Sequence, residues 1–335
     1  MNKAFGPAFF RFRRSKTPIL VFAFVAVILL SVLVGLTVGA SNFVPDPDFG
    51  KDTAIWEGEE IPYKTVYEYL VGIGYERLES GGLSEEERHA VEMDIARYEY
   101  FLETDTDERD YYDMRYEYSF GGAYWMQALF FVGVWTSIAA ALVVSIWFFP
   151  GAKSGVLRTE FLTGTPRRAL WTGKTGAAVS ASVAVPAVFS TAMLIAALCA
   201  SDVRFLAEDG LFTRVYGISV FAQWIAETAA MCAVAVLTSA FVNVVTCLSE
   251  DSAVGAVVPS VAILMLTLGM YVLTSMIPSI KIGNTTATLF PFIGLATASF
   301  DDGANALFGI TVSVHAAAAA LCFAVSYAAF RRKTL

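Results

Sequence analysis

The sequence predicts an all-α membrane protein with six transmembrane helices. Of its 335 residues, 56% are hydrophobic and only 16% are charged. A helix needs about 20 mostly apolar residues to cross the hydrocarbon core of a bilayer. Six segments meet this length, at residues 18–40, 123–149, 175–200, 218–247, 253–277 and 306–330. These runs are long and lack the alternation of membrane strands, so helices, whose backbone groups are satisfied internally, are the expected spanning elements.

Charge divides the chain into two regions. The net charge is −8, but residues 41–122 alone contain 22 acidic and 7 basic residues, a net charge of −15. The remainder carries a net charge of +7. We therefore expect residues 41–122 to form an acidic, extracellular domain, and residues 123–335 to form the five-helix remainder of the membrane body.

The acidic domain is predicted to be small and helical. Ser84 followed three residues later by Glu87 is a capping-box signature at a helix start. Apolar residues then recur at helical spacing, and they are Val91, Ile95, Tyr98 and Leu102. A preceding helix is expected at about 62–79, and a third helical segment at 107–118. The domain contains no cysteine, so no disulfide is expected to hold it together.

The distribution of Lys and Arg predicts the topology. Residues 1–17 interleave four Phe with Arg11, Arg13, Arg14 and Lys16, a composition typical of a short helix lying at the membrane interface. The short segments assigned to the inside carry 13 basic residues, against 3 in the two short outer loops. Basic loops are retained on the cytoplasmic side. We therefore expect both termini in the cytoplasm, and an apolar segment at 285–299, too short to cross, to be re-entrant on the outer face.

The loop at residues 150–174 is the most distinctive segment. Five basic residues stand against one acid, Glu160, and they are Lys153, Arg158, Arg167, Arg168 and Lys174. A phosphate-binding loop needs a glycine five positions before its Gly-Lys pair. Arg168 occupies that position before Gly173, so the loop does not bind a nucleotide in that way.

Residue order in this loop resembles the first cytoplasmic loop of the type-2 permease family of ATP-binding-cassette (ABC) exporters. The resemblance rests on Gly155, Phe161-Leu162, Thr163-Gly164-Thr165-Pro166-Arg167 and Gly173-Lys174. In that family a Gly and a Leu-rich turn precede a Ser-Arg pair, and Gly-Lys follows at the spacing seen here. Pro166 occupies the usual Ser position. The family also has an interfacial elbow helix before its first span and a re-entrant segment before its last.

This resemblance implies a function for each part of the loop. Residues 155–165, beginning at Gly155, would dock on a separate cytoplasmic ATPase subunit, with Arg158 and Glu160 as polar contacts and Phe161 and Leu162 as an apolar plug. Arg167 and Lys174 would anchor the loop to phospholipid headgroups and to the start of the third span. By this resemblance the ATPase subunits would form a dimer and would bind ATP and Mg²⁺, and no cofactor is expected on this chain itself. A second copy or a related permease would complete the transporter in the plasma membrane of a prokaryotic cell.

Two ionisable residues lie inside predicted spans. Glu227 lies about ten residues into the fourth span and His315 about nine into the sixth, and both spans enter from the outside, so we expect both groups about 14 Å deep. A carboxylate at such a depth is costly unless it faces protein or water. We expect Glu227 to line a translocation path or to pair with His315. The alternative is a protonated, purely structural Glu227, held by a backbone carbonyl or by Thr228, and a His315 that is simply packed.

Other functional classes are disfavoured by missing motifs. The sequence has no HExxH, no GxSxG and no Cys/His group with metal-ligand spacing, so we expect neither enzymatic activity nor a metal site. Its basic segments adjoin the predicted spans and form no separate surface for nucleic acid. A membrane sensor or immunity protein whose acidic domain captures a cationic peptide is the alternative to an exporter. The substrate stays open among lipids, peptides, antibiotics and polysaccharide precursors.

Overall fold

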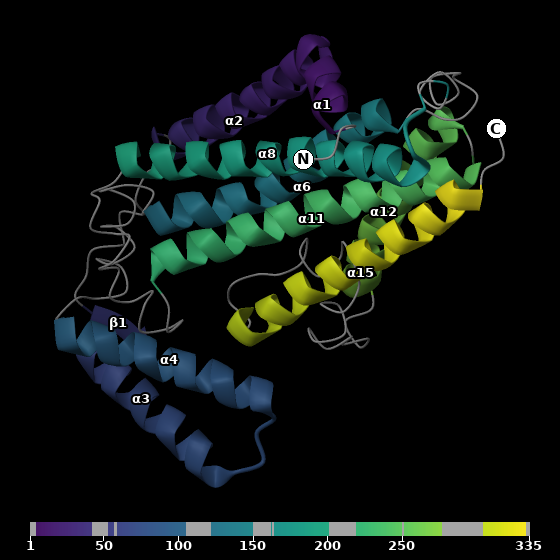
Figure 1. Cartoon of the computed structure of the whole chain (residues 1–335). Coiled ribbons are helices and arrows are strands. Elements are labelled where there is room, and N and C mark those ends of the chain that lie inside the picture. The colour runs from purple at the N-terminus through teal and green to yellow at the C-terminus, as the bar shows by residue number, and fades with distance from the viewer. Residues whose placement is uncertain are drawn as a thin grey trace.

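The structure, a computed structural model, describes residues 5–41, 53–56, 59–104, 122–149, 162, 164–200, 219–249, 251–276 and 304–332. Within these ranges the chain is helical apart from one two-stranded hairpin (Figure 1). The helices and strands are α1 (Phe5–Arg14), α2 (Thr17–Ser41), β1 (Thr53–Trp56), β2 (Glu59–Pro62), α3 (Tyr63–Ser80), α4 (Glu85–Thr104), α6 (Gly122–Phe148), α8 (Arg167–Ala200), α11 (Val220–Ser249), α12 (Ser252–Met276) and α15 (Ala304–Arg332).

Three described helices are long and apolar enough to cross a membrane. They comprise Arg167–Cys199 in α8, Val220–Ser249 in α11 and Val312–Arg332 in α15. Shorter apolar stretches lie in α2, α6 and α12, at Thr17–Ser31, Val132–Phe148 and Ala253–Met265. Many large apolar side chains of α2 and α12 are exposed, including those of Ile19 and Val257. An apolar surface of this extent is typical of contact with lipid or with another protein.

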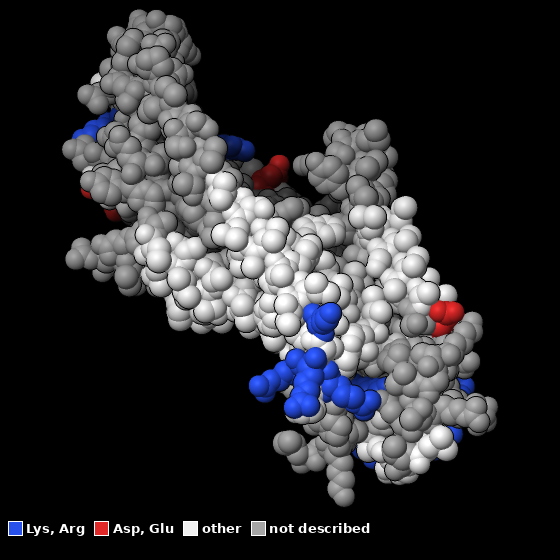
Figure 2. Space-filling view, turned by 90° about the horizontal axis from the view of Figure 1, so that it is seen from above, with Lys and Arg blue, Asp and Glu red and all other residues white. Residues whose placement is uncertain are grey.

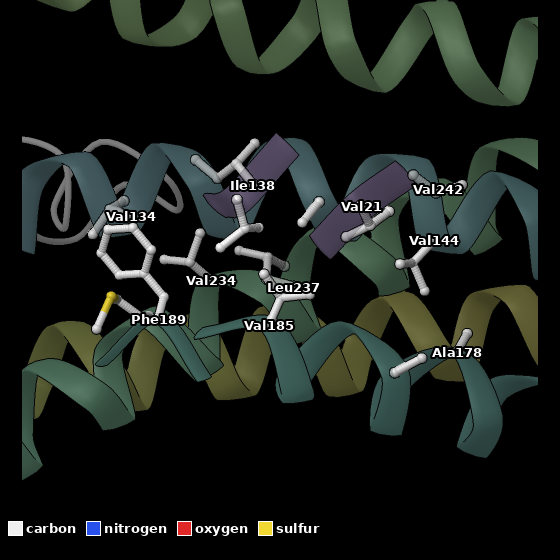
Figure 3. Packing of buried hydrophobic residues seen from close by; sticks show 14 of the residues in the cluster. Val21, Val134, Ile138, Val144, Ala178, Val185, Phe189, Val234, Leu237 and Val242 are labelled. Atoms are coloured by element: carbon white, nitrogen blue, oxygen red, sulfur yellow. The ribbon is translucent and has the colours of Figure 1, made fainter. Parts of the chain in front are cut away.

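Helix α11 is the centre of the bundle. It packs against α6, α8, α12 and α15 (Figure 1). In the most apolar 18-residue stretch of each helix, 61% is buried in α11, compared with 39% in α8 and 17% in α15. The core between α6, α8 and α11 consists of aliphatic and aromatic side chains, among them those of Val134, Val185 and Leu237 (Figure 3). A helix that is apolar on all sides is stable only where neighbours or lipid cover it, which explains the central place of α11.

One end of the bundle is basic, and we call it the basic end. It comprises α1, the end of α6, the start of α8 and the ends of α11 and α15. Helix α1 is held there by Phe12, whose ring lies 5.2 Å from that of Trp147 and 4.9 Å from that of Phe148, at the end of α6. Figure 2 shows Lys and Arg side chains gathered beside a broad surface without charged residues. The predicted helix within residues 1–17 is therefore present, as a 10-residue element separate from α2.

Residues 53–104 form a small unit of their own, with α3 and α4 as an antiparallel pair outside the bundle (Figure 1). The predicted capping box is confirmed, because Glu87 Oε2 accepts hydrogen bonds from the Ser84 amide (2.9 Å) and hydroxyl (2.8 Å). Tyr67 and Phe101 are buried between the helices. The turn that joins α3 to α4 contains Gly81 and Gly82, both exposed and with φ of 68° and 90°, a region that favours glycine.

The acidic domain, which was predicted to be small and helical, also contains a two-stranded hairpin that the sequence did not predict. Strands β1 and β2 pair antiparallel, with Thr53 opposite Pro62 and Trp56 opposite Glu59. The strands contain Ile55, Trp56 and Ile61, residue types that favour strands, but each strand is only four residues long, too short for a clear alternation. The predicted helical segment at 107–118 and the re-entrant segment at 285–299 lie outside the described residues.

Candidate functional site: the basic end and a buried carboxyl group

Most of the predicted docking loop lies outside the described residues, including Gly155, Arg158, Glu160 and Phe161. Leu162 is described, and 81% of its surface is exposed. The predicted loop at 150–174 ends earlier than expected, because α8 begins at Arg167. The Leu170 amide donates to the Pro166 carbonyl (2.9 Å), so Pro166 occupies the N-cap position of α8. The segment between α6 and α8 is therefore shorter than hydropathy alone indicates.

Arg167 connects the start of α8 to the end of α15. Its Nη1 donates a hydrogen bond to the carbonyl oxygen of Arg331 (3.0 Å). The last carbonyl groups of a helix have no donor within the helix, and a positive charge near them is favourable. Arg167 therefore supplies a donor to the C-terminus of α15. The headgroup contact predicted for Arg167 remains a prediction, whereas this contact with α15 was not foreseen.

Aromatic and apolar side chains reinforce the same junction. Leu170 is buried with Phe330 of α15 and Cys247 of α11. The ring of Trp171 lies 5.1 Å from that of Tyr327 and 6.4 Å from that of Phe323. The start of α8 thus contacts the end regions of both α11 and α15.

Lys174, the second predicted anchor, lies deeper than expected. It is on the second turn of α8 and is only 7% exposed. The hydroxyl of the next residue, Thr175, accepts a hydrogen bond from Asn243 Nδ2 of α11 (3.2 Å). A direct contact of Lys174 with lipid headgroups would require a more exposed side chain. If Lys174 anchors the loop, as predicted, its contacts must therefore lie inside the bundle and not at the lipid headgroups.

Replacing Arg167 by Ala is expected to loosen the last turn of α15. Losing one exposed, charge-assisted hydrogen bond should cost about 1 kcal/mol locally, and so accelerate amide exchange of the last turn about fivefold. Hydrogen exchange of the detergent-solubilised chain, followed by mass spectrometry, measures this. Arg168→Ala is the matched control, because Arg168 is equally basic and exposed but makes no contact with α15 that the structure describes. Equal acceleration in both variants would contradict the assigned contact.

A second group of functional interest is the buried carboxyl of Glu227. This residue lies in the second turn of α11 and is 1% exposed. Its Oε1 accepts a hydrogen bond from Gln223 Nε2 (2.9 Å), one turn earlier on the same face. Two acceptors of this pair, Glu227 Oε2 and Gln223 Oε1, are buried and have no hydrogen-bond donor among the described residues. We call Gln223 and Glu227 the carboxyl–amide pair.

The donors near this pair are already engaged elsewhere. Trp224 Nε1 donates to the Ser190 carbonyl of α8 (3.1 Å), and the Thr228 hydroxyl donates to the Trp224 carbonyl (2.7 Å). The hydroxyl groups of Ser190 and Thr228 are also hydrogen-bonded to each other. These bonds join α8 to α11. Because Trp224 and Thr228 already donate in them, neither residue donates a hydrogen bond to Glu227 Oε2. The predicted alternative, in which Thr228 satisfies Glu227, is therefore not what the structure contains.

Glu227 is hydrogen-bonded to Gln223 and not to His315, which is fully buried on α15. Cys247 of α11 and Phe330 of α15 belong to one buried cluster with Leu170, so they lie at a similar level of the bundle. Glu227 precedes Cys247 by 20 residues, but His315 precedes Phe330 by only 15. At 1.5 Å per residue, Glu227 therefore lies about 7 Å farther from the basic end. The two residues therefore lie at different levels of the bundle, and their depth in a membrane remains a prediction.

An apolar layer separates the carboxyl–amide pair from the basic end. Met231, one turn beyond Glu227, and Phe189 of α8 are both fully buried. They fill the space beside Gly133 of α6, where an added Cβ would lie 2.5 Å from Met231 Sδ and 2.9 Å from Phe189 Cε1. The Phe189 and Met231 side chains thus fill the space between α6, α8 and α11 on the side of the pair that faces the basic end. A role of Glu227 or His315 in a translocation path remains a prediction.

Gln223 was not predicted from the sequence. An uncharged amide in an apolar run gives little signal by itself, although the sequence does show that Gln223 stands four residues before Glu227, on the same helix face.

Comparisons with models of protein families, with curated proteins and with solved structures find no match to this chain.

Proposed function

We propose that the chain is the membrane-spanning permease subunit of an ABC transporter, which exports its substrate with ATP hydrolysed by a separate ATPase subunit. In this proposal α2, α6, α8, α11, α12 and α15 all cross the plasma membrane, and the basic end faces the cytoplasm. The acidic domain then lies outside. The placement of Lys and Arg at one end of the bundle supports this orientation, because basic segments are retained inside.

The observation that carries the proposal is the junction at the start of α8. The loop that resembles a docking loop leads directly into Arg167, Leu170 and Trp171, which contact α15 and α11. An ATPase that pushes on this loop would therefore move three helix ends at once. ATP and Mg²⁺ would bind only to the partner, and two nucleotide-bound states of the partner would favour two arrangements of the helices.

Reversing the charge of Glu160 is expected to separate the ATPase from the chain. If Glu160 is a polar contact at the docking surface, Glu160→Lys places a like charge against the basic group that it meets, which costs affinity and specificity. The tagged full-length chain is purified from membranes of the cell that naturally produces it. The amount of ATPase that co-purifies, and the rate at which that ATPase hydrolyses ATP, are then measured. We expect both to fall at least tenfold.

A charge reversal elsewhere provides the control. Glu76 of α3 is exposed, and Glu76→Lys should leave the ATPase bound and active. Unchanged yield and hydrolysis in Glu160→Lys would remove the docking role of that residue. A wild-type chain that carries no nucleotide hydrolase, yet binds cationic peptides through residues 41–122, would instead favour a sensor or immunity protein.

A further inference from the structure

We propose that the carboxyl–amide pair binds one monovalent cation, either a free ion or the ammonium group of a larger molecule. The inference rests on the proposed function in one point only, namely that the bound cation would be a ligand that the transporter carries or uses. Binding itself requires only this chain. The site consists of Glu227 Oε2 and Gln223 Oε1, two buried oxygens that lack donors among the described residues.

The donor and acceptor groups of the pair favour a positively charged ligand. Gln223 donates one amide N–H to Glu227 Oε1 (2.9 Å), and the two atoms of the pair that have no hydrogen-bond partner among the described residues, Glu227 Oε2 and Gln223 Oε1, are both acceptor oxygens. The neighbouring hydroxyl and indole donors serve each other and the backbone. Unpaired buried oxygens are costly. A ligand that completes the site must therefore bring donors or positive charge.

The charge of the site favours a single positive charge. Glu227 makes no ion pair with any described residue, and the buried cationic side chain of Lys174 lies at the basic end, beyond the layer of Phe189 and Met231. One carboxylate balances one positive charge. A divalent cation would require more ligands, and no group of three or more His, Cys, Asp or Glu side chains is placed to hold a metal ion in the described part of the chain.

The position of the pair indicates the side from which a cation arrives. Glu227 is seven residues into α11, about 10 Å from the end of the helix that lies away from the basic end. On the side toward the basic end, Phe189 and Met231 fill the space between α6, α8 and α11. Helix α2 ends at Ser41 and α6 begins at Gly122 at the opposite end of the bundle, and these two helices flank residues 41–122, whose net charge is −15. An acidic domain raises the local concentration of cations near that entrance.

The test measures cation binding by the full-length chain in detergent micelles, without any ATPase. Sodium, potassium, ammonium and methylammonium chloride are titrated at constant ionic strength, with choline chloride as the balancing salt, and heat of binding is recorded by calorimetry. We expect saturable binding of one cation per chain. Glu227→Gln and Gln223→Leu should each weaken it at least tenfold. Thr228→Val, in the same turn, should leave it unchanged, because that hydroxyl serves the Trp224 carbonyl.

The outcomes separate the sources of the cation and can overturn the site. Binding of sodium, potassium or ammonium but not methylammonium assigns a free ion, and binding of methylammonium assigns the ammonium group of a larger ligand. If no cation binds saturably, or if Glu227→Gln and Gln223→Leu bind as tightly as the wild type, the proposed cation site is wrong. A proton shared between Glu227 and Gln223 would then account for the two buried oxygens. None of these results depends on the ATPase, so failure of the cation site and failure of the proposed transporter function can be distinguished.

Discussion

Replacing Phe189 by Ala is expected to lower the free energy of unfolding by about 3–5 kcal/mol, which is the range for removing a buried aromatic ring. Phe189 is fully buried, beside Val134 of α6 and Val234 of α11 (Figure 3). Its loss leaves a cavity at the point where three helices meet, and close-packed helices relax only partly into such a space. Equilibrium unfolding with sodium dodecyl sulfate, followed by circular dichroism of the detergent-solubilised chain, measures the change.

Val188 provides the matched control for Phe189. It is the preceding residue of α8 and is 47% exposed, so Val188→Ala should change the free energy of unfolding by only about 0.5 kcal/mol. A second test uses Gly133, whose added Cβ would meet the Phe189 ring at 2.9 Å. Gly133→Ala should be less harmful in the Phe189→Ala background than in the wild type. Equal losses for Phe189→Ala and Val188→Ala would show that this layer is not tightly packed.

Replacing Gly255 by Ala is expected to disrupt the α11–α12 hairpin, with a loss of about 3 kcal/mol, at the upper end of the range for overpacking. A Cβ at Gly255 would overlap Thr246 Oγ1 and would lie 3.0 Å from Thr246 Cβ and 3.3 Å from its Cα. A rotation of the Thr246 side chain cannot relieve the last two contacts, so the helix axes must separate. Unfolding in sodium dodecyl sulfate again measures the loss.

The Gly255 prediction has a control on another helix. Gly309 of α15 has no atom within 4 Å of its ideal Cβ position, so Gly309→Ala should cause no loss and should favour the helix slightly. Combining Gly255→Ala with Thr246→Ala removes Oγ1 and should recover part of the stability. A Gly255→Ala variant as stable as Gly309→Ala would mean that α11 and α12 approach less closely than the structure indicates.

The helices themselves could be predicted from the sequence because apolar run length is a strong signal. Each predicted span coincides with a helix, and α12 was placed within one residue at both ends. The start of α8 could not be placed in this way. Hydropathy detects the apolar part that begins at Thr175, whereas the helix extends back through charged residues to Arg167. The helix begins where the Pro166 carbonyl accepts the first helical hydrogen bond, from the Leu170 amide, and hydropathy does not detect such a helix start.

The candidate site was predicted only in its ionisable residues. Glu227 was recognisable because a carboxyl group in an apolar run is rare. Its real partner, Gln223, and the difference in level from His315 depend on how α11 and α15 are offset, which is a tertiary property. The contact of Arg167 with Arg331 joins positions 164 residues apart, and no local pattern indicates it.

The turn between α3 and α4 offers a way to determine which side of the membrane the acidic domain faces. Gly81 and Gly82 both adopt left-handed backbone angles and are exposed, and no atom lies within 4 Å of either ideal Cβ position. Exposed turns of this kind tolerate insertions well. A short epitope inserted between the two glycines would therefore leave both helices intact, and antibody staining of intact cells against opened cells would then reveal the compartment it occupies.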